Sequence, residues 1–321
     1  MTGDGDGLLV VGDVVTDVVA RHREPLARDT DTAARIALRP GGAAANVACW
    51  AAHFAHSPGP RLGDGPSPGA RPAPGPRVRL LARAGSDTAD WHRDALLRAG
   101  VDPVLRIDAE LPTAVVIALV DADAERTLVT DSGAALRLGP EDWDEALLDG
   151  AARVHLSGYL FFAAPGRELA ALVGKAARAR GLPVSVDPAS AGFLRQAGVP
   201  RFLADVAGTD LLLPNAAEAM LLSGAAEPAL AAVELSRTYG GTVVVTLGSE
   251  GALAAYGGEL TARVPGVPAR AVDSTGAGDA FTGGLLAARL AGADLPAALA
   301  LGCRAGAAAV AVVGGRPEPP A

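Results

Sequence analysis

The chain has 321 residues, 50% of them hydrophobic, and a formal net charge of −8. It can therefore bury a sizeable core, and its acidic balance argues against nucleic acid as a partner, because proteins that bind phosphate backbones carry basic surface. The first seven residues contain two aspartates and no basic residue. We therefore expect no secretory signal and a cytoplasmic location.

Short apolar runs alternate with amphipathic stretches along most of the chain. The apolar runs predict strands over 8–11, 77–82, 151–157, 182–187, 210–214 and 242–247. The amphipathic stretches predict helices over 43–56, 88–99, 140–148, 167–180 and 228–239. This alternation is typical of an α/β fold, with a mostly parallel sheet covered on both faces, and we expect a single domain over 1–321.

Three segments depart from this alternation. Residues 14–40 and 101–130 read as strands without intervening helices, and we expect them to form a small β lid over the active edge of the domain. Residues 57–77 contain 12 prolines or glycines among 21 residues, which predicts a disordered surface loop. Residues 297–315 are apolar but interrupted by Arg304, so we expect a packed terminal helix and no membrane partner.

The lysine and cysteine content excludes several kinds of site. Lys175 is the only lysine and follows no glycine-rich loop, which excludes a Walker A site and a protein kinase. Cys49 and Cys303 belong to no metal-binding motif, and we expect buried free thiols. Any phosphate must then be held by backbone N–H groups, arginine or a metal.

The stretch DSTGAGDAFTGG, residues 273–284, leads into a helix-prone run. A glycine-rich helix entrance presents free N–H groups and a positive dipole end, which suits an anion. If Gly276, Ala277 and Gly278 turn into the helix, Asp279 lies beside these N–H groups and can accept a proton from a hydroxyl. The alternatives are a plain turn and an aspartate that only caps the helix.

Four further motifs have weaker signals. GGAAANVA gives Gly41 and Gly42 for a close backbone approach and Asn46 for a polyol, and VGDVVTD places Asp17 after the first strand. LLLPNAAE puts Asn215 and Glu218 at a helix start, either as a capping pair or with Glu218 as a water-mediated magnesium ligand. In TLGSEG, a strand end followed by glycines suits a flat nucleotide; the residues concerned are Thr246, Gly248 and Gly251.

Taken together, the chain closely resembles the ribokinase-like, or PfkB, family of carbohydrate kinases from about residue 8 to about residue 315. DSTGAGDAF matches the family signature DTTGAGDxF with one change, Ser274 for threonine. GGAAANVA matches GGxxxNxA, NAAE matches NxxE, and TLGSEG matches TLGxxG, all in the family's order. The resemblance implies a three-layer fold with a small β lid, and a possible homodimer through that lid.

The resemblance also implies the chemistry. ATP would donate its γ-phosphoryl group to a hydroxymethyl group of a small sugar, with Asp279 as base and the amides of Gly276, Ala277 and Gly278 as anion hole. The implied sugar contacts are Asp17, Gly41, Gly42 and Asn46. The implied magnesium, phosphate and nucleotide contacts are Asn215, Glu218, Thr246, Gly248 and Gly251. Asp273 matches a residue that helps to bind potassium in some relatives, so K⁺ activation is an open alternative.

The sequence leaves the substrate open. DPASAGF lacks the asparagine and arginine of the DxNxR motif found in kinases of keto-acid sugars, which disfavours a carboxylated sugar. A nucleoside kinase of adenosine or pseudouridine type is the main alternative, with Trp50, Phe54 or Phe161 as candidate stacking partners for a base. A dinucleotide-dependent oxidoreductase is excluded because no GxGxxG follows the first strand. The intact Asp279 disfavours a non-catalytic sugar-binding regulator.

Overall fold

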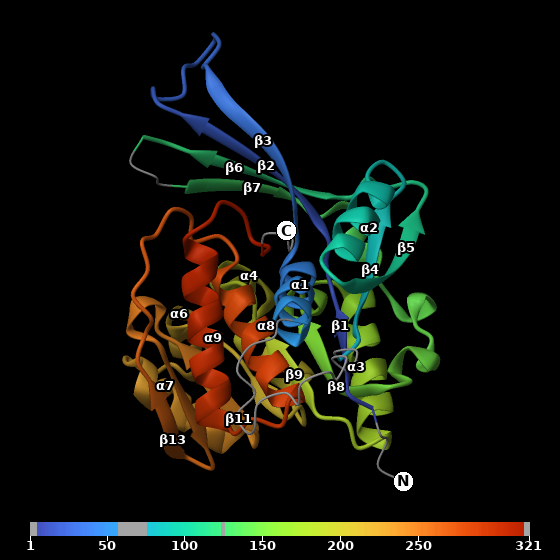
Figure 1. Cartoon of the computed structure of the whole chain (residues 1–321), viewed down its shortest axis with the longest axis vertical. Helices are drawn as coiled ribbons and strands as arrows, with labels where there is room; N and C mark the ends of the chain where they lie inside the picture. The colour runs from blue at the N-terminus through green and yellow to red at the C-terminus, as the bar shows by residue number, and fades with distance from the viewer. Residues whose placement is uncertain (1–4, 57–75, 123–125, 318–321) are drawn as a thin grey trace, which may run out of the picture.

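The computed structural model describes residues 5–56, 76–122 and 126–317, arranged around two sheets (Figure 1). Nearly all of the segment 57–77 therefore lies outside the described residues. In spatial order the large sheet contains β13 (Glu259–Val264), β12 (Ala252–Tyr256), β11 (Thr242–Thr246), β10 (Leu211–Leu212), β9 (Val184–Asp187), β8 (Ala151–Ser157), β1 (Gly7–Val11), β4 (Val78–Gly85) and β5 (Val101–Asp108). Its pairings are parallel from β11 to β5, and β12 and β13 are antiparallel additions at one edge.

Helices cover both faces of the large sheet, which gives three layers. One face carries α1 (Ala43–His56), α2 (Ala89–Arg98), α8 (Ala277–Leu290) and α9 (Leu295–Val310). The other carries α3 (Ala164–Ala179), α4 (Ala191–Ala197), α5 (Val199–Asp205), α6 (Ala216–Ser223) and α7 (Pro228–Tyr239). The central strand β1 is apolar and fully buried because successive side chains enter opposite layers: Leu8 and Val10 pack on the α1 face, and Leu9 and Val11 on the α3 face.

The second sheet is a four-stranded lid in the order β3 (Ala34–Gly41), β2 (Val15–His22), β6 (Ala114–Val120) and β7 (Arg126–Asp131). It projects beyond the carboxyl ends of the large sheet in Figure 1. Assigning the whole of 101–130 to the lid is wrong, because β5 pairs in parallel with β4 at the edge of the large sheet. The helix expected over 140–148 is also absent: Pro140–Asp142 and Glu145–Leu148 form separate 3₁₀ turns, interrupted at Trp143 and Asp144 by extended backbone.

Small residues let α8 lie close to both α1 and α9. A Cβ atom on Gly283 would lie 2.6 Å from the Cβ atom of Trp50 and 2.7 Å from the carbonyl oxygen of Val47, both on α1. A Cβ atom on Gly284 would lie 2.8 Å from the Cβ atom of Ala305 on α9. The position of α8, and of the motif at its start, is therefore fixed from both sides.

The apolar C-terminal segment packs as expected. Its helix, α9, is capped by Asp294, whose side chain accepts a hydrogen bond from the Ala297 N–H at 2.9 Å. Within the described part of the chain, no single helix has the length and hydropathy to cross a membrane. The helices α6 and α7 meet this length and hydropathy only when they are taken together, and the pair is bent by 53°.

Replacing Gly283 by alanine tests this packing. We expect Gly283→Ala to destabilise the fold by about 1–3 kcal/mol, because the added methyl group meets the backbone of α1. Gly174→Ala in α3 is the matched control: its Cβ would meet only the end of the Arg178 side chain, at 3.4 Å, so helix propensity makes this change neutral or stabilising. Urea unfolding midpoints measure both effects, and equal midpoints for the two variants would contradict the packing argument.

Candidate active site

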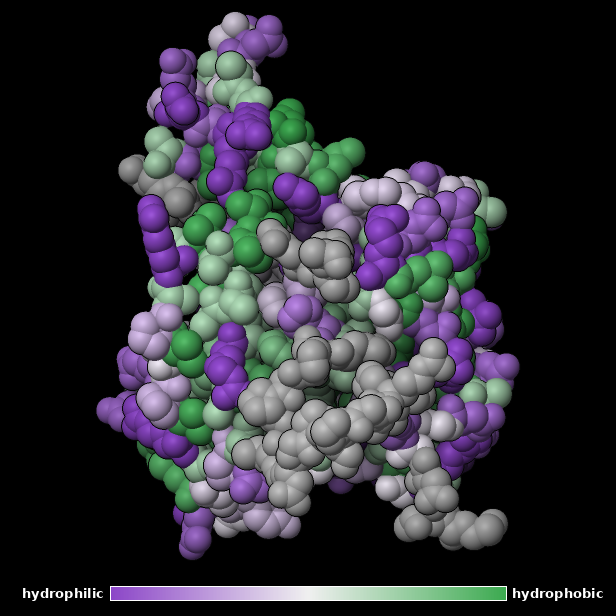
Figure 2. Space-filling view, in the orientation of Figure 1, coloured by the Kyte–Doolittle hydropathy of each residue, from purple (hydrophilic) through white to green (hydrophobic). Residues whose placement is uncertain are grey.

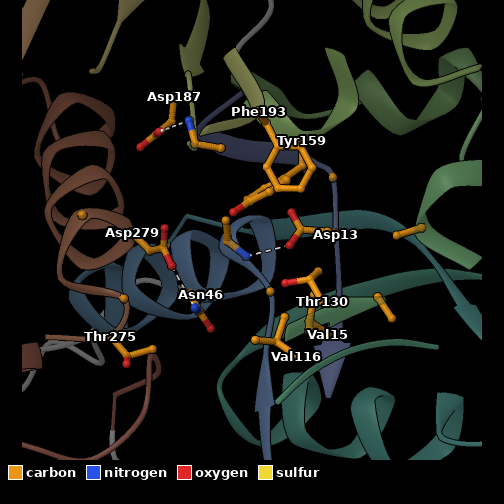
Figure 3. Close-up of a pocket in the computed structure, with 18 of the residues that line it drawn as sticks. Asp13, Val15, Asn46, Val116, Thr130, Tyr159, Asp187, Phe193, Thr275 and Asp279 are labelled. Atoms are coloured by element: carbon orange, nitrogen blue, oxygen red, sulfur yellow. Dashed lines mark hydrogen bonds between the residues drawn. The ribbon is translucent and has the colours of Figure 1, made fainter. Parts of the chain in front are cut away.

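A cavity of about 380 Å³ lies between the carboxyl ends of the parallel strands and the lid. This edge is where open α/β sheets bind ligands. Asp13, Asp187 and Thr246 line it from the large sheet, and Val116 and Thr130 line it from the lid. Figure 3 shows these carboxylates and the start of α8 around one space. The fold thus brings together motifs that lie more than 200 residues apart in the sequence.

The start of α8 forms one wall of the cavity. The helix begins at Ala277, preceded by Gly276 with φ +71°, a left-handed conformation that favours glycine. A Cβ atom on Gly276 would also lie 2.5 Å from the Cα atom of Gly315. Gly276, Ala277, Gly278 and Asp279 all line the cavity, so N–H groups of the first helical turn and the Asp279 carboxylate share this wall.

Asp279 is held by Asn46 of α1. The Asn46 side-chain amide donates to Asp279 Oδ2 at 2.8 Å, shown as a dashed line in Figure 3. Burial raises the pKa of Asp279 well above its usual value; the Asn46 hydrogen bond lowers it, and the nearby carboxylates of Asp187, Asp13 and Asp17 raise it further. A carboxylate with a raised pKa is a stronger base than an ordinary aspartate and suits proton abstraction from a hydroxyl.

Gly42, just before α1, and Asp17, on the lid strand β2, form a further part of the cavity lining. Gly42 has φ +100°, and a Cβ there would lie 2.6 Å from the Asp13 carbonyl oxygen, so only glycine fits. Asp17 lines the cavity, and burial raises its pKa to about 6, while the charge of Arg316 acts in the opposite direction. Gly41 does not line the cavity; it lies behind Asp17, with no space for a side chain.

Asn215 and Glu218 form the opposite wall and are also a capping pair. The Glu218 N–H donates to Asn215 Oδ1 at 3.0 Å, and the Asn215 N–H donates to Glu218 Oε2 at 2.9 Å. Both residues line the cavity, so the capping alternative and a functional position coexist. Burial, followed by the Asp187 charge, raises the pKa of Glu218 to about 7. Among the described residues, no group of three or more His, Cys, Asp or Glu side chains could hold a metal ion.

Comparison with known proteins agrees with this geometry. The model of the pfkB family of carbohydrate kinases matches residues 6–321. The chain belongs to this family. It is therefore an ATP-dependent phosphotransferase of the ribokinase-like fold. Fructokinase from Klebsiella pneumoniae is 30% identical over 288 residues, covering 87% of this chain and 82% of that protein.

Two solved structures illustrate the range of the fold. The adenosine kinase from Sinorhizobium meliloti superposes with a TM-score of 0.82 at 22% identity, covering 97% of this chain and 96% of that one. The aminoimidazole riboside kinase from Salmonella enterica, complexed with aminoimidazole riboside and an ATP analog, has a TM-score of 0.74 at 27% identity, covering 98% and 96%. Sugar and nucleoside kinases therefore share the architecture of this pfkB family member.

Some motif residues of this pfkB kinase lie outside the cavity. Gly248 and Gly251 form the turn between β11 and β12, where a Cβ on Gly251 would lie 2.5 Å from the Gly266 nitrogen. A second hollow lies beside this turn, lined by Ser249, Glu250, Arg263, Pro265 and Gly266. Asp273 also lies outside the cavity, and its carboxylate accepts hydrogen bonds from Thr275 and from the Gly314 N–H.

The structure corrects the aromatic candidates. Trp50 and Phe161 are buried in the core, and Phe54 packs against the core beside Trp50, so none of the three lines the cavity. Tyr159, Phe162 and Phe193 line it instead. Tyr159 follows β8, and Phe193 lies in α4 within the DPASAGF segment. The letters GYLFF and AGFL carry no periodicity that distinguishes them from core sequence, so only their place at the sheet edge reveals them.

Asp13 is a further residue of the cavity; it lies within VGDVVTD, the motif in which the sequence predicts a ligand contact only for Asp17. Its carboxylate accepts from the Ala43 N–H at 2.8 Å, from the Ala44 N–H at 3.3 Å and from the Ser157 hydroxyl at 3.0 Å. It thus ties the start of α1 to the ends of β1 and β8. This contact positions Asn46 one turn further along α1.

Asp279→Asn tests the electrostatic cost of the site. At alkaline pH, where Asp279 is ionised, the wild type buries this charge, so we expect Asp279→Asn to raise the Tm by roughly 2–4 °C. The gain should shrink as the pH falls toward the usual aspartate pKa, because a group with a raised pKa takes up its proton in the folded state first and the cost of the buried charge is then lost. Calorimetry at alkaline and at acidic pH measures this. A Tm gain independent of pH would contradict the raised pKa.

Proposed function

We propose that this pfkB kinase transfers the γ-phosphoryl group of ATP to a hydroxymethyl group of a small sugar, with Asp279 as general base. The observation that carries the proposal is the shared wall: Asp279 and the N–H groups at the start of α8 face the same cavity as Asp17 and Asn46. A hydroxyl bound on the Asp17 side can therefore meet both a proton acceptor and an anion site.

The reaction follows from these positions. Asp17 and Asn46 bind and orient the sugar hydroxyl groups, and Asp279 takes the proton of the attacking hydroxyl. The hydroxyl oxygen forms a bond to the γ-phosphorus as the bond to the ADP oxygen breaks. The N–H groups of Gly276, Ala277 and Gly278 stabilise the negative charge on the transferred group. ADP and a sugar phosphate leave.

Two acidic side chains of the cavity suit a magnesium ion. Glu218 and Asp187 provide the oxygen ligands that Mg²⁺ prefers, and both line the cavity. We propose that Glu218 holds Mg²⁺ through water, beside the phosphates of ATP. When bound, the ion neutralises phosphate charge. We also propose that Asp273 lies at a site for a monovalent cation, which rates measured in K⁺ and in Na⁺ would test.

Asp279→Asn is the direct test of the general base. We expect turnover to fall by roughly 10²–10⁴-fold, because the amide cannot accept the proton, while ATP binding is retained. The matched control is Asp90→Asn on the exposed side of α2, which should leave turnover unchanged. The measurement is ADP release with Mg-ATP and ribose, fructose, other neutral hexoses, 2-keto-3-deoxygluconate, adenosine or pseudouridine. Turnover of Asp279→Asn close to that of the wild type would exclude this role.

A nucleoside kinase is the second candidate, and the aromatic wall favours it. The ring centroids of Tyr159 and Phe193 lie 5.8 Å apart, and the rings of Phe162 and Phe193 stack at 5.1 Å. Such a wall can stack on the planar base of a riboside. The similar Salmonella kinase, crystallised with aminoimidazole riboside, supports this reading.

Phe193→Ala separates the two candidates. For a nucleoside, we expect KM to rise about tenfold, because base stacking on an aromatic ring contributes about 1–3 kcal/mol. For a free sugar, KM should remain within about twofold. Phe202→Leu, in the core next to Phe161, controls for a general loss of packing. An equal KM for the nucleoside in wild type and Phe193→Ala would argue against stacking.

The lid also suggests an assembly. Ile36 and Leu38 of β3 are 64% and 61% exposed and alternate with residues that face the cavity side. Ile117 and Val129 continue this apolar outer face across β6 and β7, and Figure 2 shows hydrophobic side chains between hydrophilic ones on the lid. We propose that two copies pair through this face as a homodimer. Sedimentation of the wild type and of Leu38→Glu would test it.

A further inference from the structure

Arg316, near the end of the described chain, lies against the GG motif. Its Nη2 atom donates to the Gly41 carbonyl oxygen at 2.8 Å, and its Nε atom donates to Asn46 Oδ1 at 3.4 Å. Asn46 in turn donates from Nδ2 to Asp279 Oδ2 at 2.8 Å. The three side chains form one directed chain of donors, from the C-terminal segment to the proposed base.

This chain fixes the polarity of the Asn46 amide. Because Oδ1 accepts from a guanidinium, Nδ2 must face Asp279, and the reverse orientation would set two donors against each other at Arg316 and two acceptors at Asp279. Without Arg316, Asp279 alone would set this orientation, and only while it is ionised, because a protonated Asp279 can donate to the Asn46 oxygen. With Arg316 in place, by contrast, Asn46 offers the cavity an N–H and no acceptor.

The burial of Arg316 argues against a merely structural role. Its Nη1 atom is buried, and among the residues that the structure describes it has no hydrogen-bond partner. An unpaired buried donor is destabilising, so a simple anchor for the C-terminal segment would be better made by another side chain. The backbone already anchors this segment, because the Gly314 N–H donates to Asp273 and the Gly315 carbonyl accepts from Trp50.

We propose that Arg316 is a positioning residue for phosphoryl transfer: it orients Asn46 so that Asp279 remains a hydrogen-bond acceptor, ready for the substrate proton. This inference rests on the proposed role of Asp279. A substrate oxygen that meets Asn46 must then accept a hydrogen bond, whereas one that meets Asp17 must donate, and a hydroxyl group of the proposed sugar does both.

The charged and titratable groups around this chain define the expected pH behaviour. Those facing Arg316 are Asp17 of β2, Asp13 after β1, Cys49 of α1 and His92 of α2. Those facing Asp279 are Asp13, Asp17, Asp187 and Tyr159. The Asn46 hydrogen bond lowers the pKa of Asp279, and the Arg316 charge lowers that of Asp17. Loss of Arg316 should therefore move proton uptake at both carboxylates to higher pH.

The first test needs no activity. Asn46 and Asn215 are the only asparagines in the sequence, so labelling with ¹⁵N-asparagine gives two side-chain amide pairs, which Asn46→Ala assigns. We expect Arg316→Met to shift the Asn46 pair and to raise the midpoint of its pH titration. The Asn215 pair, which caps α6, should stay in place and reports an intact fold. Unchanged Asn46 signals would overturn the proposal even if the protein phosphorylated none of the test compounds.

The second test is a double-mutant cycle on turnover. We expect Arg316→Met to lower kcat by roughly 10–100-fold, with KM for ATP unchanged, and Arg316→Lys to restore part of the loss. In an Asn46→Ala background the Arg316→Met change should lower kcat much less, because its route to Asp279 is already cut and only its effect on the pKa of Asp17 remains. Fully additive losses would overturn the proposal. Arg304→Met, on the exposed side of α9, is the matched control.

A wild type without kinase activity would separate the role of Arg316 from the proposed function. If the wild type releases no ADP with any compound, the proposed function fails, while the amide spectra still decide the role of Arg316. If the wild type is active and Asp279→Asn is not, the spectra and the cycle together decide it. Should Arg316→Met fail to fold, the same spectra are recorded for Arg316→Lys. This variant keeps the charge but cannot reach both Gly41 and Asn46, so the Asn46 pair should still shift.

Discussion

The close packing of α8 between α1 and α9 is the constraint on which the rest of the site depends. Gly283 and Gly284 let backbones approach where a larger residue would separate them. This packing sets the start of α8 at the carboxyl edge of the sheet, within reach of Asn46. The N–H groups at the start of α8 and the Asp279 carboxylate therefore occupy fixed positions before any ligand arrives, which is the preorganisation that electrostatic catalysis requires.

The site gathers carboxylates that repel one another. Asp13, Asp17, Asp187, Glu218 and Asp279 share one neighbourhood, and burial raises the pKa of four of them. Asp13 shows how such a charge is accommodated, because two backbone N–H groups and a hydroxyl donate to it. The others also accept hydrogen bonds, Asp279 from Asn46, Asp187 from Thr282 and Glu218 from Asn215, and the Arg316 charge lowers the pKa of Asp17. The mutual repulsion of these carboxylates lowers the stability of the folded state, as is common where side chains serve function.

The lid gives the cavity its second half. Its strand β2 follows β1 directly, so Asp17 is carried from the sheet edge to the roof of the cavity within six residues of Val11. The register of β2 with β6 places Val116 beside Asp17 on the same face. In β3, which pairs with β2, the same alternation places Ile36 and Leu38 on the outer face of the lid. One pattern of alternation thus builds both the cavity roof and the apolar outer face.

The sequence by itself determined the α/β alternation, the helix entrance at Gly276 and the motif residues, because these depend on local periodicity, glycine conformation and short spacings. The tertiary structure alone decided that β5 joins the large sheet, since strand pairing is a long-range choice. It also decided that Tyr159 and Phe193 line the cavity and that Trp50 and Phe161 do not, because the sequence does not reveal which face an aromatic residue occupies. Arg316 belongs with these: 270 positions separate it from Asn46, and only the folded chain makes them neighbours.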